Sequence, residues 1–99
     1  MSNLEFLRNY IEIASKIKKI AREYDDSARV IVFGSVIRGT YNAASDLDVL
    51  IISEKRELWK IIRGKIFLEF LNEPVEVHFA TESEYVNWYM KFIDVSEEI

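Results

Sequence analysis

Residues 30–52 read VIVFGSVIRGTYNAASDLDVLII, two apolar runs joined by a polar stretch that contains two of the three glycines in the chain. The first run is rich in β-branched residues, which predicts a buried strand over residues 28–33 that ends at Gly34. Residues 35–38 are expected to form a single helical turn. The second run predicts another strand over residues 46–52, in which successive side chains point to opposite faces. Two strands joined by a short helical loop are therefore the expected centre of the fold.

The flanking sequence predicts one further strand and three longer helices. Apolar residues recur there at helical spacing, and Ser2-x-x-Glu5 and Thr81-x-x-Glu84 are plausible capping boxes. The expected elements are a helix over 4–24, a helix over 54–71 that Ser53 can cap, a strand over 75–80, and a helix from 82 to about 95. The order α-β-α-β-α-β-α indicates one α/β (α+β) domain over residues 1–99, with a short mixed three-stranded sheet flanked by helices.

Composition limits the classes of function. The chain has 99 residues, 49% of them hydrophobic, and a formal net charge of −4. Surfaces that bind nucleic acids usually carry a basic excess, so this charge argues against direct binding of long DNA or RNA. The absence of cysteine excludes disulfides and thiolate zinc sites. No apolar stretch approaches the roughly 20 residues of a membrane span, and the N-terminus lacks the apolar region of a signal peptide. We therefore expect a cytoplasmic protein with no membrane partner.

Two aspartates in the quoted stretch indicate a metal site. On a strand, Asp46 and Asp48 lie on the same face with Cα atoms roughly 6.5 Å apart. Two carboxylates this close repel each other unless a cation lies between them, and Mg²⁺ is often held by one or two carboxylates together with substrate phosphates. Gly34 and Ser35 offer the other half of such a site, because a ligand can approach the glycine main chain and the serine hydroxyl adds a donor. Glu76 can join the aspartates as a third carboxylate that binds a second ion or accepts a proton.

Each of these residues also has an ordinary structural interpretation. The two aspartates can be a solvated strand end, Ser35 can be a helix cap, and Glu76 can be a charge that discourages pairing at the edge of a sheet. Arg38 can bind phosphate or pair with an aspartate to hold the loop. His78 shares the face of Glu76, but a lone histidine is more often structural.

The quoted stretch also resembles a known signature. It contains Gly-Ser, then ten residues, then Asp-x-Asp, and this arrangement is similar to the signature of the polymerase-β-like nucleotidyltransferase superfamily. The form GSxxRG…SDLD resembles the minimal nucleotidyltransferases of that superfamily, the MNT proteins. The resemblance implies attack of an acceptor hydroxyl on the α-phosphorus of ATP or another NTP, with release of pyrophosphate. It also implies a nucleotidyltransferase core fold.

Position by position, the resemblance assigns one group of residues to the nucleotide and another to two Mg²⁺ ions. The residues assigned to the triphosphate are Gly34 and Ser35, and the catalytic, metal-binding residues are Asp46, Asp48 and Glu76. Arg38 is a further candidate for nucleotide and phosphate binding because of its charge, not because of the resemblance. The family more often has aspartate at the third acidic position.

The resemblance implies a protein partner as well. Minimal nucleotidyltransferases are commonly encoded beside HEPN-domain ribonuclease toxins and act as antitoxins, some of them by transferring AMP to a tyrosine of the toxin. The alternative is a non-catalytic, nucleotide-binding antitoxin that neutralises its partner by binding alone. The last predicted helix carries more apolar surface than one stripe, which we expect to pack against the first helix or to form an interface with a helical partner or a second copy of the chain.

Overall fold

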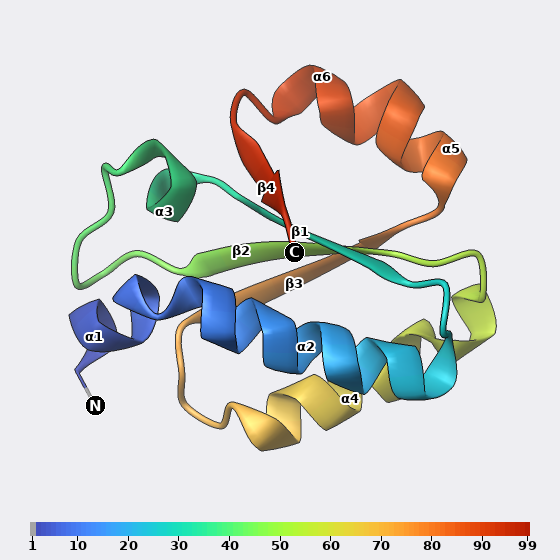
Figure 1. The fold of residues 1–99 in the computed structure, drawn as a ribbon, viewed down its shortest axis with the longest axis horizontal. Coiled ribbons are helices and arrows are strands. Elements are labelled where there is room, and N and C mark those ends of the chain that lie inside the picture. The colour runs from blue at the N-terminus through green and yellow to red at the C-terminus, as the bar shows by residue number, and fades with distance from the viewer. Residues whose placement is uncertain (1) are drawn as a thin grey trace.

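A mixed sheet of four strands forms the middle layer of the molecule (Figure 1). The structure is a computed structural model that describes residues 2–99. In the order in which they pair, the strands are β3 (Val75–Ala80), β2 (Leu47–Ile52), β1 (Arg29–Phe33) and β4 (Ser96–Glu98). β1 is antiparallel to β2 and to β4, whereas β2 and β3 are parallel. The predicted mixed sheet is confirmed, but it has four strands where three were predicted.

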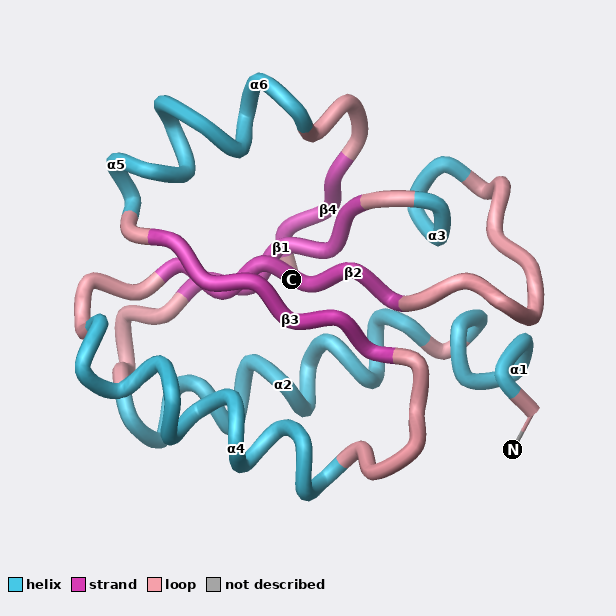
Figure 2. The backbone as a smooth tube through the Cα atoms, turned by 180° about the vertical axis from the view of Figure 1, so that it is seen from behind, coloured by secondary structure: helices cyan, strands magenta, loops and turns pink. Residues whose placement is uncertain are grey.

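Three helices cover one face of the sheet, as Figures 1 and 2 show from opposite sides. They are α1 (Asn3–Arg8), α2 (Tyr10–Tyr24) and α4 (Trp59–Glu69). Between them and the sheet lies the larger of two cores, and its largest fully buried side chains are Leu7, Ile17, Val30, Val32, Leu47, Val49, Ile51 and Ile62. Within residues 2–99, no helix is long and apolar enough to cross a membrane.

The single helix predicted over residues 4–24 is interrupted at Asn9. This residue has φ −91° and ψ 27°, and its N–H donates to the carbonyl oxygens of Glu5 and Phe6. Asparagine is a weak helix former, so a local departure from helical angles is tolerated at this position. Ser2 caps α1 by accepting a hydrogen bond of 3.2 Å from the N–H of Glu5, which is one half of the predicted capping box.

The helix predicted from residue 54 begins later, because a turn and a 3₁₀ segment (Arg56–Leu58) precede α4. Ser53 does not cap this helix. Its Oγ donates to Oδ2 of Asp25 at 2.6 Å and accepts from the N–H of Lys55 at 3.2 Å. Asp25 and Ser53 are both buried, so their hydrogen bond joins the end of β2 to the loop that follows α2.

A helical segment over residues 82–92 covers the other face of the sheet. It consists of α5 (Glu82–Glu84), a π-helical turn (Tyr85–Tyr89) and α6 (Met90–Phe92). A second, smaller core lies beneath it, in which Tyr85, Tyr89 and Ile93 pack against Ile31, Leu50, Ile52 and Ala80. The prediction that the last helix packs against the first is wrong, because the two lie on opposite faces of the sheet (Figure 1).

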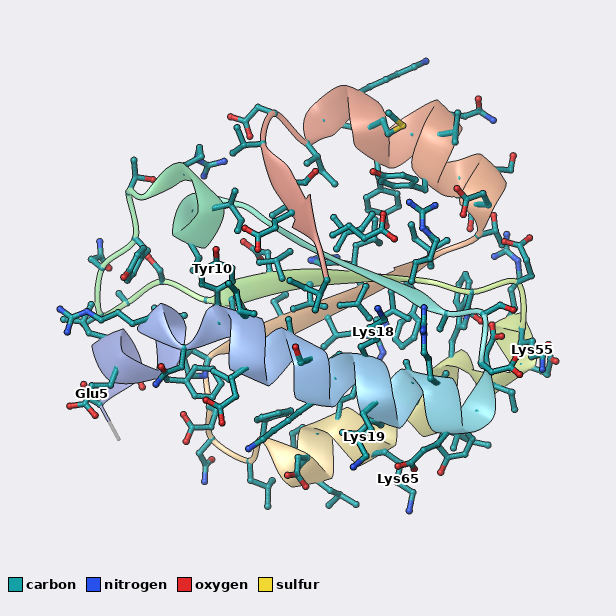
Figure 3. The ribbon with its side chains drawn as sticks, in the orientation of Figure 1. Glu5, Tyr10, Lys18, Lys19, Lys55 and Lys65 are labelled. Atoms are coloured by element: carbon teal, nitrogen blue, oxygen red, sulfur yellow. The ribbon has the colours of Figure 1, made fainter. Side chains whose placement is uncertain are left out.

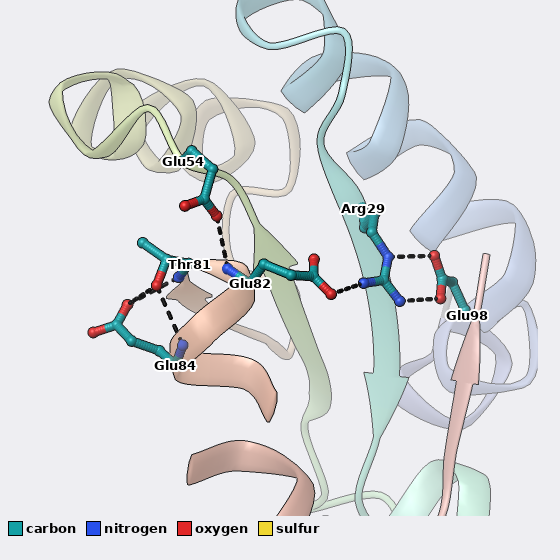
Figure 4. A network of polar contacts seen from close by, with 6 residues as sticks. All are labelled: Arg29, Glu54, Thr81, Glu82, Glu84 and Glu98. Atoms are coloured by element: carbon teal, nitrogen blue, oxygen red, sulfur yellow. Dashed lines mark hydrogen bonds and ion pairs between the residues drawn. The ribbon is translucent and has the colours of Figure 1, made fainter. Parts of the chain in front are cut away.

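Polar contacts hold this segment to the strands below it (Figure 4). The predicted capping box is confirmed: Oγ1 of Thr81 accepts from the N–H of Glu84 at 3.3 Å, and the Glu84 carboxylate accepts from the N–H of Thr81 at 2.9 Å. Arg29 of β1 pairs with the carboxylate of Glu82. The same guanidinium donates two hydrogen bonds, of 2.9 and 2.7 Å, to Glu98 of β4.

The fourth strand is absent from the prediction, in which the last helix continued to about residue 95. β4 is only three residues long, and its sequence Ser-Glu-Glu has no apolar alternation. Distant side chains help to hold it: the Tyr10 hydroxyl donates to Glu97 at 2.9 Å, and Lys18 donates to the main-chain oxygen of Ile99 at 2.8 Å. Figure 3 shows Tyr10 and Lys18 on α2. Local sequence patterns do not contain contacts of this kind.

Replacing Ser53 with alanine tests the buried hydrogen bond to Asp25. The carboxylate would lose its shortest hydrogen bond, so we expect the free energy of unfolding at pH 7 to fall by about 1–3 kcal/mol. This hydrogen bond is the main cause that holds the pKa of Asp25 below its usual value. Its contribution is therefore present above the unfolded-state pKa of about 4 and is lost as the pH falls through the lowered folded-state pKa.

The measurement is urea denaturation of the wild type and Ser53→Ala across this pH range, with the exposed Ser83→Ala as the control. The stability difference should narrow below about pH 4, and Ser83→Ala should stay within about 0.5 kcal/mol of the wild type. A difference that does not depend on pH would contradict this account of Asp25.

Candidate active site

The end of β1 meets the start of β2 at Gly34. This residue has φ 83° and ψ −155°, a main-chain conformation that side-chain-bearing residues rarely adopt. A Cβ atom added to Gly34 would lie 2.3 Å from Oδ2 of Asp48. A glycine at this position therefore lets the Asp48 carboxylate lie directly against the main chain.

The predicted helical turn after Gly34 is confirmed as α3 (Ser35–Arg38). The N–H of Arg38 donates to the Gly34 carbonyl at 3.0 Å, and Gly39, with φ 77°, ends the turn. Ser35 is half-buried at the start of α3, next to the glycine that contacts Asp48. The first N–H groups of a helical turn have no partner within it, so this end of α3 is suited to an anionic group.

Asp48 lies between two neighbours in the sheet, Phe33 on β1 and Glu76 on β3. The parallel register of β2 and β3 places Glu76 beside Asp48, as the alternation of β3 predicts. His78 joins them: one ligand atom from each of these three side chains lies within 4.8 Å of the other two. Oε1 of Glu76 is 3.5 Å from Nε2 of His78. The structure therefore brings together two of the three predicted acidic residues and a histidine that sequence analysis favoured as structural.

These three side chains fit a divalent cation. Adjacent ligand atoms of an octahedral ion with bonds of about 2.1 Å lie about 3 Å apart, and opposite ones about 4 Å. The ligand atoms of Asp48, Glu76 and His78 lie within 4.8 Å of one another, which is at most slightly more than the distance between opposite ligands of such an ion. All three side chains are exposed or half-buried, so small rotations would bring their ligand atoms onto one ion.

Burial and like charge raise the pKa of Asp48 to about 6. Desolvation is the largest cause, followed by the charge of Glu76 and a hydrogen bond with it. His78 lowers the pKa, and Asp46 adds a small further increase. At neutral pH the cluster therefore carries negative charge in a partly desolvated position, which a bound cation would neutralise.

Two of the predicted site residues lie at the margin of this cluster. Asp46 immediately precedes β2 and is exposed, and its carboxylate is not among the three grouped ligand atoms. Arg38 points its Nη1 atom to within 3.4 Å of Oδ1 of Asp94, and both side chains are exposed. Of the two interpretations of Arg38, the structure therefore shows the pairing with an aspartate. That aspartate comes from the segment before β4 and was not singled out in the sequence.

A cleft of about 730 Å³ opens beside the cluster, along the free edge of β3. Glu76 and His78 lie in its lining, together with side chains from α4 and the residue after it on one face of the sheet and from the segment on the other face: Trp59, Arg63, Ile66, Phe67, Phe70 and Tyr89. Arg63 spans this edge by donating to the Val77 carbonyl at 3.3 Å, with its guanidinium 5.1 Å from the centre of the Phe79 ring.

No pattern in the sequence predicts this cleft. Trp59, Arg63 and Phe67 recur every four residues, which places them on one face of α4. That spacing alone does not show whether the face meets the core, solvent or a cleft.

Comparisons with known proteins agree on one class. A family model of the nucleotidyltransferase domain matches residues 14–99. A crystal structure of a candidate nucleotidyltransferase superimposes with a TM-score of 0.72 at 31% identity, covering 86% of this chain and 95% of the other. Another, from Sulfolobus solfataricus, has a TM-score of 0.63 at 22% identity, covers 99% of this chain and 86% of the other, and supports the fold alone. A comparison with curated proteins gives no match.

Gly34→Ala should weaken metal binding as well as stability, whereas alanine at the other positive-φ glycine of this loop should affect stability alone. Alanine at this φ stores about 1–3 kcal/mol of strain, and its Cβ would also displace Asp48. Gly39→Ala is the control for a positive φ without a clash, because Gly39 lies in the milder left-handed helical region, with φ 77° and ψ 15°, and has nothing within 4 Å of an added Cβ. Urea denaturation should show a loss of stability in both variants, whereas a Mn²⁺ titration should show weakened binding only in Gly34→Ala. Equal metal binding by the two variants would contradict this role of Gly34.

The raised pKa of Asp48 predicts a pH dependence for the metal-free protein. The folded state holds a proton on Asp48 more tightly than the unfolded state, so the contribution of this group to stability is lost as the pH rises through about 6. Asp48→Asn cannot ionise. In a chelator it should be more stable than the wild type at pH 8, by about 1–3 kcal/mol, and similar to it at pH 3, which lies below the unfolded-state pKa of about 4.

Denaturation at these two pH values checks the prediction. Asp26→Asn serves as the control, because Asp26 is exposed in the loop before β1, whereas the cluster lies at the end of that strand. If Asp48→Asn were less stable than the wild type at both pH values, the predicted free-energy cost of ionising Asp48 in the folded state would be refuted.

Proposed function

Because the nucleotidyltransferase model spans residues 14–99, the chain belongs to this family, and we propose that it transfers AMP from ATP to a hydroxyl group of a partner protein. In this reaction the hydroxyl oxygen attacks the α-phosphorus and the bond from that phosphorus to the bridging oxygen breaks. The hydroxyl proton passes to a carboxylate or to water, and pyrophosphate leaves with its electron pair. Another NTP in place of ATP would react in the same way.

The observation that carries the proposal is the position of Asp48, which lies against the Gly34 main chain and beside Glu76. We assign Asp46, Asp48 and Glu76 to two Mg²⁺ ions. When bound, such ions supply positive charge that stabilises both the attacking and the leaving oxygen. Gly34 and Ser35 would orient the triphosphate, because the main chain there is open to close approach and α3 begins with free N–H groups.

Glu76 stands where the family more often has aspartate. Its register opposite Asp48 supports a role as the third carboxylate, either as a metal ligand or as the group that accepts the proton of the attacking hydroxyl. We also assign Arg38 to the triphosphate. Its present pairing with Asp94 is a solvent-exposed ion pair, which contributes little to stability, so a phosphate group can replace it at little energetic cost.

The cleft beside Glu76 supports a bulky acceptor. Its volume of about 730 Å³ lies within the usual range for ligand sites, roughly 300–1,000 Å³. Trp59, Phe67 and Tyr89 give it an aromatic lining, which suits an aromatic side chain such as tyrosine. The cleft also opens onto Glu76 and His78, so an acceptor that reached this part of it would bring its hydroxyl group to the carboxylates.

The outer side of the segment over residues 82–92 supports a protein partner. Large apolar side chains are solvent-exposed there: Val86 (51%), Trp88 (65%), Met90 (55%) and Phe92 (74%). The rings of Trp88 and Phe92 lie 5.8 Å apart, so part of this surface is continuous. We assign it to a HEPN-domain ribonuclease toxin that the protein neutralises. The same surface favours the second candidate function, neutralisation by binding alone.

Calorimetric titration with ATP in Mg²⁺ tests the proposed site. The double variant Asp46→Asn, Asp48→Asn should lose metal-dependent ATP binding, because two of the proposed carboxylate ligands become neutral amides. Asp26→Asn removes one exposed carboxylate at the far end of β1 and should bind ATP as the wild type does. Circular dichroism spectra of the variants should be unchanged.

Transfer itself is measured with radiolabelled ATP and the co-purified partner. The wild type and Asp26→Asn should label the partner, and Asp48→Asn should lower the rate by at least about 100-fold. Labelling that survives in the double variant would rule out the enzyme. ATP-independent capture of the partner without labelling would support the binding-only antitoxin.

A further inference from the structure

His78 is the only histidine in the chain, and it belongs to the acidic cluster. It occupies β3 opposite Leu50, on the strand face shared with Glu76. Its ring centre is 5.7 Å from that of Phe33, at an interplanar angle of 51°. The half-buried imidazole therefore extends from β3 to the Phe33 ring of β1, with its Nε2 close to the Glu76 carboxylate.

The contact between His78 and Glu76 is not a complete hydrogen bond. The separation of 3.5 Å between Nε2 and Oε1 exceeds the usual range of about 2.7–3.2 Å for an N–H···O bond. A ring nitrogen close to two carboxylates, but without a short hydrogen bond to Glu76, can offer its lone pair to a metal ion. Asp48, Glu76 and His78 together provide two oxygen donors and one nitrogen donor.

The nitrogen changes which metal the site prefers. Mg²⁺ strongly favours oxygen ligands and gives up its water reluctantly, whereas imidazole binds first-row transition ions well. A set of oxygen donors alone would not discriminate strongly in favour of Mn²⁺, but a set with one imidazole would.

We propose that His78 is a direct metal ligand beside Asp48 and Glu76, and that this position binds a first-row transition ion such as Mn²⁺ in preference to Mg²⁺. The inference rests on the proposed function and changes one element of it, the identity of the ion at this position. Asp46, which lies outside the three grouped atoms, is left to a second ion.

Metal and protein alone test the inference, without nucleotide. The first readout is pulsed electron paramagnetic resonance of Mn²⁺ bound to the wild type, in which a coordinated imidazole gives ¹⁴N modulation. We expect this modulation in the wild type and its loss in His78→Gln, which replaces the nitrogen donor with an amide oxygen of similar reach. Absence of bound Mn²⁺, or of ¹⁴N modulation, in the wild type would overturn the proposal without reference to any variant.

The second readout is the ratio of Mn²⁺ to Mg²⁺ affinity, with Mg²⁺ measured by competition. His78→Gln should weaken Mn²⁺ binding by at least about 10-fold and change Mg²⁺ binding little. Glu76→Gln is the contrasting variant, because removal of a carboxylate should weaken both ions and leave their ratio nearly constant. An unchanged ratio in His78→Gln would mean that His78 only packs against Phe33.

The outcome is separable from that of the proposed function. Nitrogen ligation with no AMP transfer would contradict the function and leave the metal assignment standing. AMP transfer with no nitrogen ligation would contradict the metal assignment and leave the proposed function standing.

Discussion

The contact between the Asp48 carboxylate and the Gly34 main chain is the constraint on which the rest of the molecule depends. It requires β1 to be followed by a residue with a positive φ and no side chain, and β2 to begin at a fixed distance from it. The apolar residues of β2 secure that distance, since Leu47, Val49 and Ile51 enter the larger core while Leu50 enters the smaller one. A slip of one residue would exchange these faces and turn the carboxylate away, so core packing fixes the register of the site.

Much of this arrangement is predictable from short stretches of sequence. The strands β1, β2 and β3 and the turn α3 follow from apolar runs, alternation and two glycines, all of which are local signals. The interruption at Asn9, the short strand β4 and the position of the last helical segment are not predictable in this way. β4 pairs with β1, and Arg29 and Tyr10 hold its side chains while Lys18 holds Ile99 just after it, all from elements distant in the sequence; neither the alternation rule nor the capping rule contains that information.

The candidate site, too, is only partly predictable from local sequence. Spacing along single strands predicts that Asp48 and Glu76 can share a face, and the parallel pairing of β2 and β3 places them together. Spacing does not choose between alternatives for a side chain that can reach several partners. Arg38 finds Asp94, and His78 lies with the carboxylates, because the sheet brings together residues that are far apart in the chain. Assignment of their roles therefore needed the tertiary structure.

The two faces of the sheet are covered very unequally. Beneath the helical segment over residues 82–92, the buried side chains are Ile31, Leu50, Ile52 and Ala80, whereas the other face carries the main core of the protein. Less apolar area resists detachment of this segment, although salt bridges of Arg29 and Arg56 also restrain it. Its amide protons should therefore exchange with solvent through partial openings that leave α2 and the central strands intact. A partner bound to Trp88 and Phe92 would suppress such openings, so occupancy of that surface would be recorded as slower hydrogen exchange of the amides within residues 82–92.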